Sequence, residues 1–245
     1  MTYVKSKKYA THENSSTDFA GPGGLKLAEF LAEKMSLVDG RKMIDVGFHR
    51  GYQTCFLARE YGINIVGIDP GGNIGGVDYG IEPLMANARA FGVDDKILGI
   101  KVGVPDTLLP CDYFDYAYTT TCLEMIRNYE GVDGYLAALR EIFRVLKTGG
   151  ILGLGEPMCL GVPSNEIAPY CEKYNFDKCF TTIENTKNAV AEAGFTVLEH
   201  GYCEDADEWW REHASASDDP SYLKDVELMV AGGWLSFGYV IAVKK

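Results

Sequence analysis

The segment Met43-Ile44-Asp45-Val46-Gly47-Phe48-His49-Arg50-Gly51 decides the fold that we expect for this chain. Its apolar run ends in a turn with two glycines, residues 52–61 follow as a helix, and a second apolar run over 63–68 ends at Asp69. This order of features opens a β-α-β unit that binds a nucleotide at the carboxyl ends of its strands. We therefore expect the rest of the chain either to continue this sheet or to cover the turn.

Length and charge limit the class of protein. With 245 residues, 47% of them hydrophobic, the chain can build one large core, so we expect a single domain over 1–245. The formal net charge of -12 argues against tight nucleic-acid binding, which needs clustered Lys and Arg. No apolar run approaches the roughly 20 residues of a membrane helix, and residues 1–8 lack the apolar core of a signal peptide. We expect a cytoplasmic protein with a small-molecule substrate and no nucleic-acid or membrane partner, and leave a homodimer open.

Strands and helices alternate along the chain. Apolar runs predict strands over 42–46, 63–68, 97–102, 114–119, 151–155, 196–200 and 235–243. Helical spacing predicts helices over 25–35, 52–61, 81–91, 135–146 and 183–193, the last opened by a capping box from Thr181 to Glu184. The alternation predicts an α/β, Rossmann-like, mostly parallel seven-stranded sheet with helices on both faces. An irregular insertion before the last strand indicates that this strand is antiparallel.

Three kinds of segment stand outside this alternation. Residues 1–24 form a polar arm that we expect to be flexible, either over the ligand or as a disordered terminus. Residues 71–76 predict a flexible loop, and 157–180 and 204–234 are expected insertions that cover the substrate. The seven cysteines show no C-x-x-C spacing, so we expect mostly buried apolar residues and no metal site.

Polar side chains at the strand ends define the expected site. Asp45, Gly47, Gly51, Asp69 and the segment Thr119-Thr120-Thr121 project into one crevice. Glycines let a ligand approach the backbone, and Asp69 can accept hydrogen bonds from both hydroxyls of a ribose. In the alternative interpretation, Asp69 only caps its strand and the glycines only shape a loop.

Spacing distinguishes between nucleotides. A dinucleotide fingerprint beginning at Gly47 needs glycines at 49 and 52, where the chain has His49 and Tyr52. An NAD(P)-dependent oxidoreductase is therefore an alternative that this turn disfavours.

Four segments carry a resemblance to a known family: 44–51, 66–70, 109–115 and 139–150. From about residue 25 to 245 the chain resembles the class I S-adenosylmethionine-dependent methyltransferases, in the small-molecule group often called type 11 or UbiE-like. The stretch Arg144-Val145-Leu146-Lys147-Thr148-Gly149-Gly150 is similar to the family's Arg-Val-Leu-Lys-Pro-Gly-Gly. The resemblance implies in-line methyl transfer from S-adenosylmethionine, leaving S-adenosylhomocysteine.

The resemblance also implies where the cofactor lies. The positions that it assigns to cofactor binding are Asp45, Gly47, Phe48, His49, Gly51, Asp69, Pro70, Gly103, Val104, Asp106, Thr119 and Thr120. Two of them depart from the family pattern. Val104 stands where the family usually presents an acidic residue to adenine, which leaves Asp106 as a substitute, and His49 replaces the central glycine of the turn.

Candidate catalytic residues follow the same strand ends. His49, Glu124 and Glu156 could take a proton from the methyl acceptor, or could act only as loop filler and helix or backbone caps. Six aromatic residues in and around the insertions suit an apolar, planar or cationic substrate, or pack a lid onto the sheet. They are Tyr170, Tyr174, Tyr202, Trp209, Trp210 and Trp234.

Two further hypotheses stay open at this point. The altered turn and the missing adenine carboxylate are also compatible with a subunit that binds S-adenosylmethionine without catalysis. Cysteines near the fifth strand and the lid allow a methyltransferase acting on a thiol-binding metalloid.

Overall fold

The computed structural model of the chain describes residues 2–9, 21–74 and 76–245. Its main sheet has seven strands in the order β5-β2-β1-β6-β7-β9-β8, and β9 runs antiparallel to both β7 and β8. The strands are β1 (Lys42–Val46), β2 (Asn64–Ile68), β5 (Ile97–Ile100), β6 (Phe114–Thr120), β7 (Leu146–Cys159), β8 (Thr196–Tyr202) and β9 (Leu235–Val243). The expected sheet and its antiparallel last strand are confirmed.

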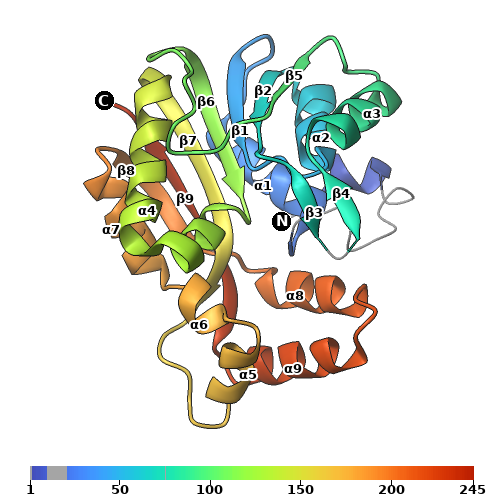
Figure 1. Cartoon of the computed structure of the whole chain (residues 1–245), viewed down its shortest axis with the longest axis vertical. Helices are drawn as coiled ribbons and strands as arrows, with labels where there is room; N and C mark the ends of the chain where they lie inside the picture. The colour runs from blue at the N-terminus through green and yellow to red at the C-terminus, as the bar shows by residue number, and fades with distance from the viewer. Residues whose placement is uncertain (1, 10–20, 75) are drawn as a thin grey trace.

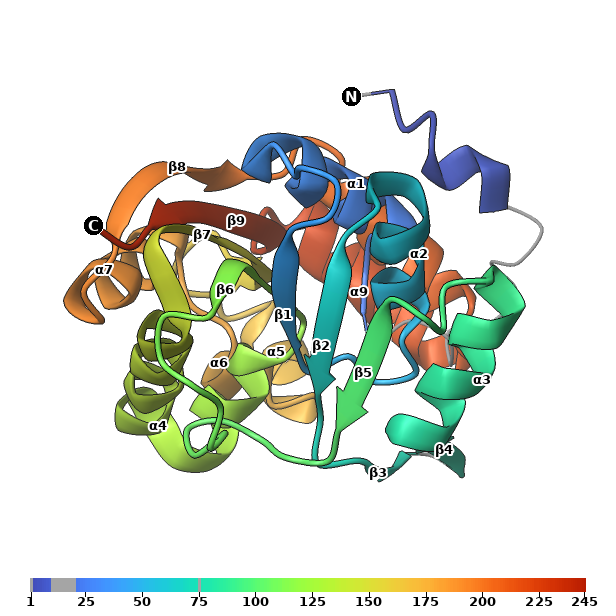
Figure 2. The same cartoon turned by 90° about the horizontal axis from the view of Figure 1, so that it is seen from above.

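Helices cover both faces of this sheet (Figure 2). On one face lie α1 (Gly24–Met35), α2 (Tyr52–Tyr61) and α3 (Ile81–Phe91), and on the other lie α4 (Leu123–Val145) and α7 (Ile183–Glu192). Strand β1 alternates between the two cores, since Met43 packs with α1 and α2 while Ile44 packs with α4. This double cover explains the nearly continuous apolar character of the central strands.

Three local features differ from the sequence expectations. Residues on either side of position 75 form a hairpin of β3 (Gly72–Ile74) and β4 (Val77–Tyr79), where a flexible loop was expected. Helix α4 begins at Leu123 and is interrupted at Gly131, whose φ of 71° and ψ of -166° are not helical. The N-cap of α7 is Thr182, which accepts from the Asn185 backbone amide, so the helix is capped one residue later than expected and by a single bond, not by the expected capping box.

Four helices form a cover beyond the carboxyl ends of the strands. They are α5 (Ala168–Lys173), α6 (Phe176–Cys179), α8 (Ala206–Ser215) and α9 (Pro220–Ala231). Figure 1 shows them below the sheet, on the side toward which β6 points. A separate apolar cluster, which includes Trp210 and Trp234, holds the cover together, whereas Trp209 packs into the main core beside Phe30.

The first residues are tied to the body of the protein. Ser6–Tyr9 form a short 3-10 helix (η1), and both oxygens of the buried Glu29 carboxylate accept backbone bonds, from Lys5 N at 2.9 Å and Ser6 N at 2.7 Å. Residues 2–9 are therefore anchored, although we expected a flexible arm over 1–24. The part of that arm over 10–20 lies outside the described residues.

The described residues contain neither a membrane-spanning helix nor a disulfide. In residues 2–9, 21–74 and 76–245, no helix is both long and apolar enough to cross a membrane. All seven cysteines are free thiols, five of them buried, with Cys111 exposed and Cys122 half-buried. The expectation that most of them are buried apolar residues is confirmed.

Candidate functional site

The glycine turn after β1 is wedged between two helices. Gly47 and Gly51 have φ of 82° and 78°, in the left-handed region that favours glycine. A Cβ at Gly47 would lie 2.3 Å from the Cys122 sulfur, and one at Gly51 would lie 2.1 Å from Cδ1 of Leu84. The turn therefore contacts the residue before α4 on one side and α3 on the other.

Inside the turn, Phe48 and His49 face different parts of the protein. Phe48 is buried, and its ring contacts the backbone of Gly67, where a Cβ would lie 2.7 Å from the ring. His49 has a φ of 53° and stacks its ring on Tyr79 of the hairpin, with centroids 5.0 Å apart and planes inclined by 23°. The side chain that replaces the central glycine is thus accommodated by the β3–β4 hairpin, which the sequence did not predict.

Asp69 lies just beyond the carboxyl end of β2 and is 5% exposed. Its Oδ2 accepts from His49 N at 2.9 Å and its Oδ1 accepts from Gly71 N at 2.7 Å. Burial raises the pKa of this carboxyl above its ordinary value, although the two backbone bonds act in the opposite direction. Each oxygen retains a second lone pair, so the group can still accept two hydrogen bonds from a ligand.

Asp45 supports the turn from beneath. It is 2% exposed, and its Oδ2 accepts from Thr54 Oγ1 of α2 at 2.6 Å. Burial raises the pKa of Asp45 to about 7, the Thr54 bond lowers it, and the nearby Asp69 charge raises it further. This contact joins β1 to the first turn of α2.

The end of β6 is organised by Gln53, a residue that sequence reasoning missed. Gln53 Oε1 accepts from Thr120 Oγ1 at 2.7 Å and from Tyr118 OH at 3.1 Å, while its Nε2 donates to Gly24 O at 2.7 Å. Thr119 instead donates to the Val46 carbonyl at 3.1 Å. The signal for Gln53 was its place in the first turn of α2, directly after the glycine turn.

The loop after β5 contains the residues that were expected to contact the adenine: Gly103, Val104 and Asp106. Beside Gly103 the space is open, since a Cβ at this position would meet only Pro70, at 3.8 Å or more. Val104 is half-buried against the core on the α4 face, and Asp106 is exposed. The structure thus leaves an uncrowded edge at Gly103 and turns Asp106 to solvent.

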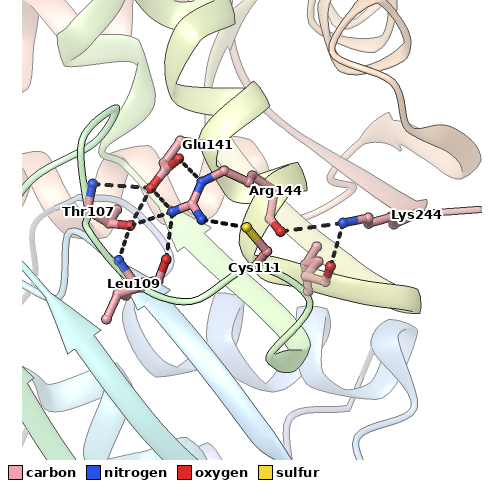
Figure 3. A network of polar contacts seen from close by, with 7 residues as sticks. Thr107, Leu109, Cys111, Glu141, Arg144 and Lys244 are labelled. Atoms are coloured by element: carbon pink, nitrogen blue, oxygen red, sulfur yellow. Dashed lines mark hydrogen bonds and ion pairs between the residues drawn. The ribbon is translucent and has the colours of Figure 1, made fainter.

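Helix α4 anchors this loop by a polar network (Figure 3). Glu141 Oε1 accepts from Thr107 N at 3.1 Å, and the two carboxylate oxygens accept from Arg144 Nε and Nη2, each at 2.7 Å. Arg144 also donates to Leu109 O at 2.8 Å and to Cys111 Sγ at 3.0 Å. The network fixes the far part of the loop that begins at the expected adenine contacts.

Glu156, on β7, is 1% exposed and strongly bonded through one oxygen. Its Oε1 accepts from Arg127 at 3.1 Å, from Tyr135 OH at 3.1 Å and from Thr186 Oγ1 at 2.9 Å. Arg127 also donates to Cys179 O at 2.8 Å, which links the cover to α4. Among the described residues, Glu156 Oε2 is buried without a hydrogen-bond partner.

Glu124, in the first turn of α4, is also 1% exposed, and its Oε2 is likewise buried without a partner among the described residues. Burial, followed by the charge of Glu156, raises the pKa of Glu124 to about 8. Burial also raises the pKa of the Cys122 thiol, and the charges of Glu124, Asp69 and Asp45 add to this. Cys122 therefore lies within electrostatic reach of Glu124 and of both aspartates.

Most of the aromatic residues expected to cover the substrate use their polar groups to stabilise the protein. Tyr174 donates to Asp225, Trp210 to Ser236 O, Trp234 to Gly161 O and Tyr202 to Cys159 O, each at 2.9 Å. Tyr202 belongs to strand β8, outside both insertions, and Tyr170 packs at the edge of the cover cluster. Within the described ranges, no group of three or more His, Cys, Asp or Glu side chains could hold a metal ion.

Comparison with known proteins gives consistent matches. Residues 24–200 match a family model described as a methyltransferase domain. Phosphoethanolamine N-methyltransferase 1 of Arabidopsis thaliana is 26% identical over 180 residues, which cover 73% of this chain and 33% of that protein. For a sterol 24-C-methyltransferase of Yarrowia lipolytica the identity is 32% over 127 residues, covering 52% of this chain and 30% of that protein. The chain thus spans about a third of the length of these curated relatives.

A solved structure extends the likeness to the whole chain. An S-adenosylmethionine-dependent methyltransferase from Geobacter sulfurreducens, in complex with S-adenosylhomocysteine, has a TM-score of 0.65 and 18% identity, and covers 100% of this chain and 99% of that one. At this identity the likeness concerns the fold alone.

Proposed function

This chain belongs to the family of proteins with a methyltransferase domain, and on that premise we propose that it is an S-adenosylmethionine-dependent methyltransferase acting on a small molecule. The observation that carries the proposal is the Asp69 carboxylate, buried at the end of β2 beside a turn with two left-handed glycines. Two backbone amides fix its orientation and leave lone pairs for a ribose. The residues present therefore fit this cofactor.

Other residues on the same edge would complete the cofactor site. The backbone at Gly47 and Gly51 would face the methionine end, and the open edge at Gly103 would receive the adenine ring. Thr119 and Thr120 would act through the backbone at the end of β6, because their hydroxyls already bond within the protein. When bound, the cofactor supplies an electrophilic methyl group on a sulfonium.

The chain's own task is to orient an acceptor toward that methyl group and to exclude water. The cover helices lie beyond the strand ends and are held together by a buried apolar cluster. Of the three candidate catalytic residues, we infer that Glu124 takes the proton, with Glu156 held in place by Arg127. We assign the His49 ring a supporting role, since it stacks on Tyr79.

Isothermal titration with S-adenosylhomocysteine tests the proposed site. We expect micromolar binding by the unaltered protein, weakened at least about 100-fold in Asp69→Ala, because two charge-assisted hydrogen bonds of about 1.5–3 kcal/mol each are lost. The matched control is Asp78→Asn in the exposed hairpin, which should bind like the unaltered protein. No binding at high micromolar ligand, or equal affinity in Asp69→Ala, would refute the assignment.

Three assays distinguish the alternatives. A non-catalytic binder would bind the cofactor and transfer no labelled methyl group to any acceptor, and an oxidoreductase would bind NADH. A metalloid methyltransferase would show arsenite-dependent turnover.

We further propose that the protein works in the cytoplasm without nucleic acid, in keeping with its net charge of -12. A homodimer is the oligomeric state to test, by light scattering during gel filtration.

A further inference from the structure

Four buried carboxyl groups surround the proposed site. Asp45, Asp69, Glu124 and Glu156 are each at most 5% exposed, and the charges of the first three all act on the Cys122 thiol. The guanidinium of Arg127, whose side chain is 9% exposed, bonds Glu156. When they are ionised, buried carboxylates favour a positively charged ligand.

One carboxylate oxygen of each glutamate also lacks a hydrogen-bond partner among the described residues. In the part of the chain that the structure describes, Glu124 Oε2 and Glu156 Oε2 have no donor although both are buried. Buried polar atoms in native proteins are almost always hydrogen-bonded, because an unsatisfied one costs about 1–3 kcal/mol and a charged one more. An incoming donor group would satisfy them.

The chemistry of the donor can be narrowed further. Two acceptor oxygens from two different residues call for a group with at least two donors, and once the carboxyl groups are ionised their charge calls for a cation. A hydroxyl offers one donor and no charge, whereas an ammonium group offers up to three donors with a charge. A carbon acceptor offers neither.

We propose that the methyl acceptor is an amine, whose nitrogen is bound between Glu124 and Glu156 and deprotonated by Glu124. This inference rests on the proposed function of the same site. The ammonium gives one proton to the Glu124 carboxylate, and the freed nitrogen lone pair forms a bond to the methyl carbon. The carbon–sulfur bond breaks, its electron pair stays on sulfur as the thioether forms, and Glu124 later releases its proton to solvent.

The experiment uses the full chain with trideuteromethyl S-adenosylmethionine and a panel of matched acceptors. Each pair shares one carbon skeleton and differs only in amine or hydroxyl, such as 2-phenylethylamine with 2-phenylethanol and ethanolamine phosphate with ethylene glycol phosphate. Mass spectrometry locates the label. Glu124→Gln is the test variant, and Glu130→Gln, at an exposed position of the same helix, is the control.

We expect label on nitrogen, a fall in kcat of at least about 100-fold in Glu124→Gln, and unchanged binding of S-adenosylhomocysteine in that variant. Glu130→Gln should keep full activity. In the unaltered protein kcat should rise with pH through about 8, the pKa of Glu124, and this limb should vanish in Glu124→Gln. A residue that only supported the fold would leave the limb in place.

Label on oxygen or carbon, no transfer to any panel member, or an unchanged pH limb in Glu124→Gln would overturn the amine proposal. Failure of the unaltered protein to bind S-adenosylhomocysteine would instead refute the proposed function itself, so the two failures are distinguishable.

Discussion

Glu141→Gln tests whether helix α4 stabilises the loop that begins at the adenine edge. The carboxylate is 9% exposed and accepts from Thr107 N at 3.1 Å and twice from Arg144 at 2.7 Å. The glutamine amide keeps the size of the side chain but removes its charge. It also places an NH2 group against the N–H donors of Arg144 or Thr107. Bonds to a charged group contribute about 1.5–3 kcal/mol. Since 37% of the Arg144 side chain is exposed, we expect a total loss of only about 2–3 kcal/mol.

Urea unfolding followed by circular dichroism measures this loss in the free energy of unfolding. The matched control is Arg140→Gln on the same helix, whose ion pair with Glu192 spans 3.5 Å with both side chains more than half exposed. We expect the control to change stability by less than about 0.5 kcal/mol. Titration with S-adenosylhomocysteine should show weaker binding in Glu141→Gln, whereas the affinity of Arg140→Gln should equal that of the unaltered protein.

The pH dependence gives a second readout. Burial raises the pKa of Glu141, but bonds from Arg144 and Thr107 outweigh it, so the folded-state pKa lies below the ordinary value. The stabilisation is therefore present above the unfolded-state pKa of about 4.3 and is lost as pH falls through the folded-state value. The stability difference between the unaltered protein and Glu141→Gln should shrink in acid. Equal stability of Glu141→Gln and Arg140→Gln at neutral pH would refute the reasoning.

Three further predictions concern the turn and the cover. Gly51→Ala should lower the free energy of unfolding by about 1–3 kcal/mol in urea, because its φ is 78° and a Cβ would meet Leu84; equal stability would contradict this. His49→Gly removes a left-handed non-glycine residue, so binding of S-adenosylhomocysteine in titration should stay within about threefold, about 0.7 kcal/mol; a tenfold loss would show that the ring contacts the ligand. Burial lowers the pKa of His213 to about 4, so stability should fall between pH 6.5 and 4. His213→Gln should flatten that profile, and an unchanged slope would exclude this histidine as its cause.

Elements with uninterrupted patterns could be predicted from the sequence. The bounds of β1, α3 and β9 agree with the expected ranges to the residue. In each of these runs the apolar residues keep a regular spacing despite any glycine or proline. The antiparallel direction of β9 beside β8 was expected from the irregular insertion before it, whereas its pairing with β7 was not predicted.

Elements that depend on long-range contacts were missed. The β3–β4 hairpin lies in a glycine-rich segment with no apolar alternation. The contact of Tyr79 with the His49 ring is visible only in the folded chain. The first part of α4 was missed because Gly131 breaks the helical period. Gln53 looked like an ordinary polar residue of a helix surface, since its partners at Gly24 and Thr120 lie far away in the chain.

A crystal structure of the chain with S-adenosylhomocysteine tests the central claim most directly. The proposal predicts the ligand at the carboxyl ends of β1 and β2, both ribose hydroxyls within hydrogen-bond distance of the Asp69 carboxylate, and the adenine beside Gly103. The sulfur should point toward Glu124. A ligand bound elsewhere, or a ribose that makes no contact with Asp69, would contradict the account.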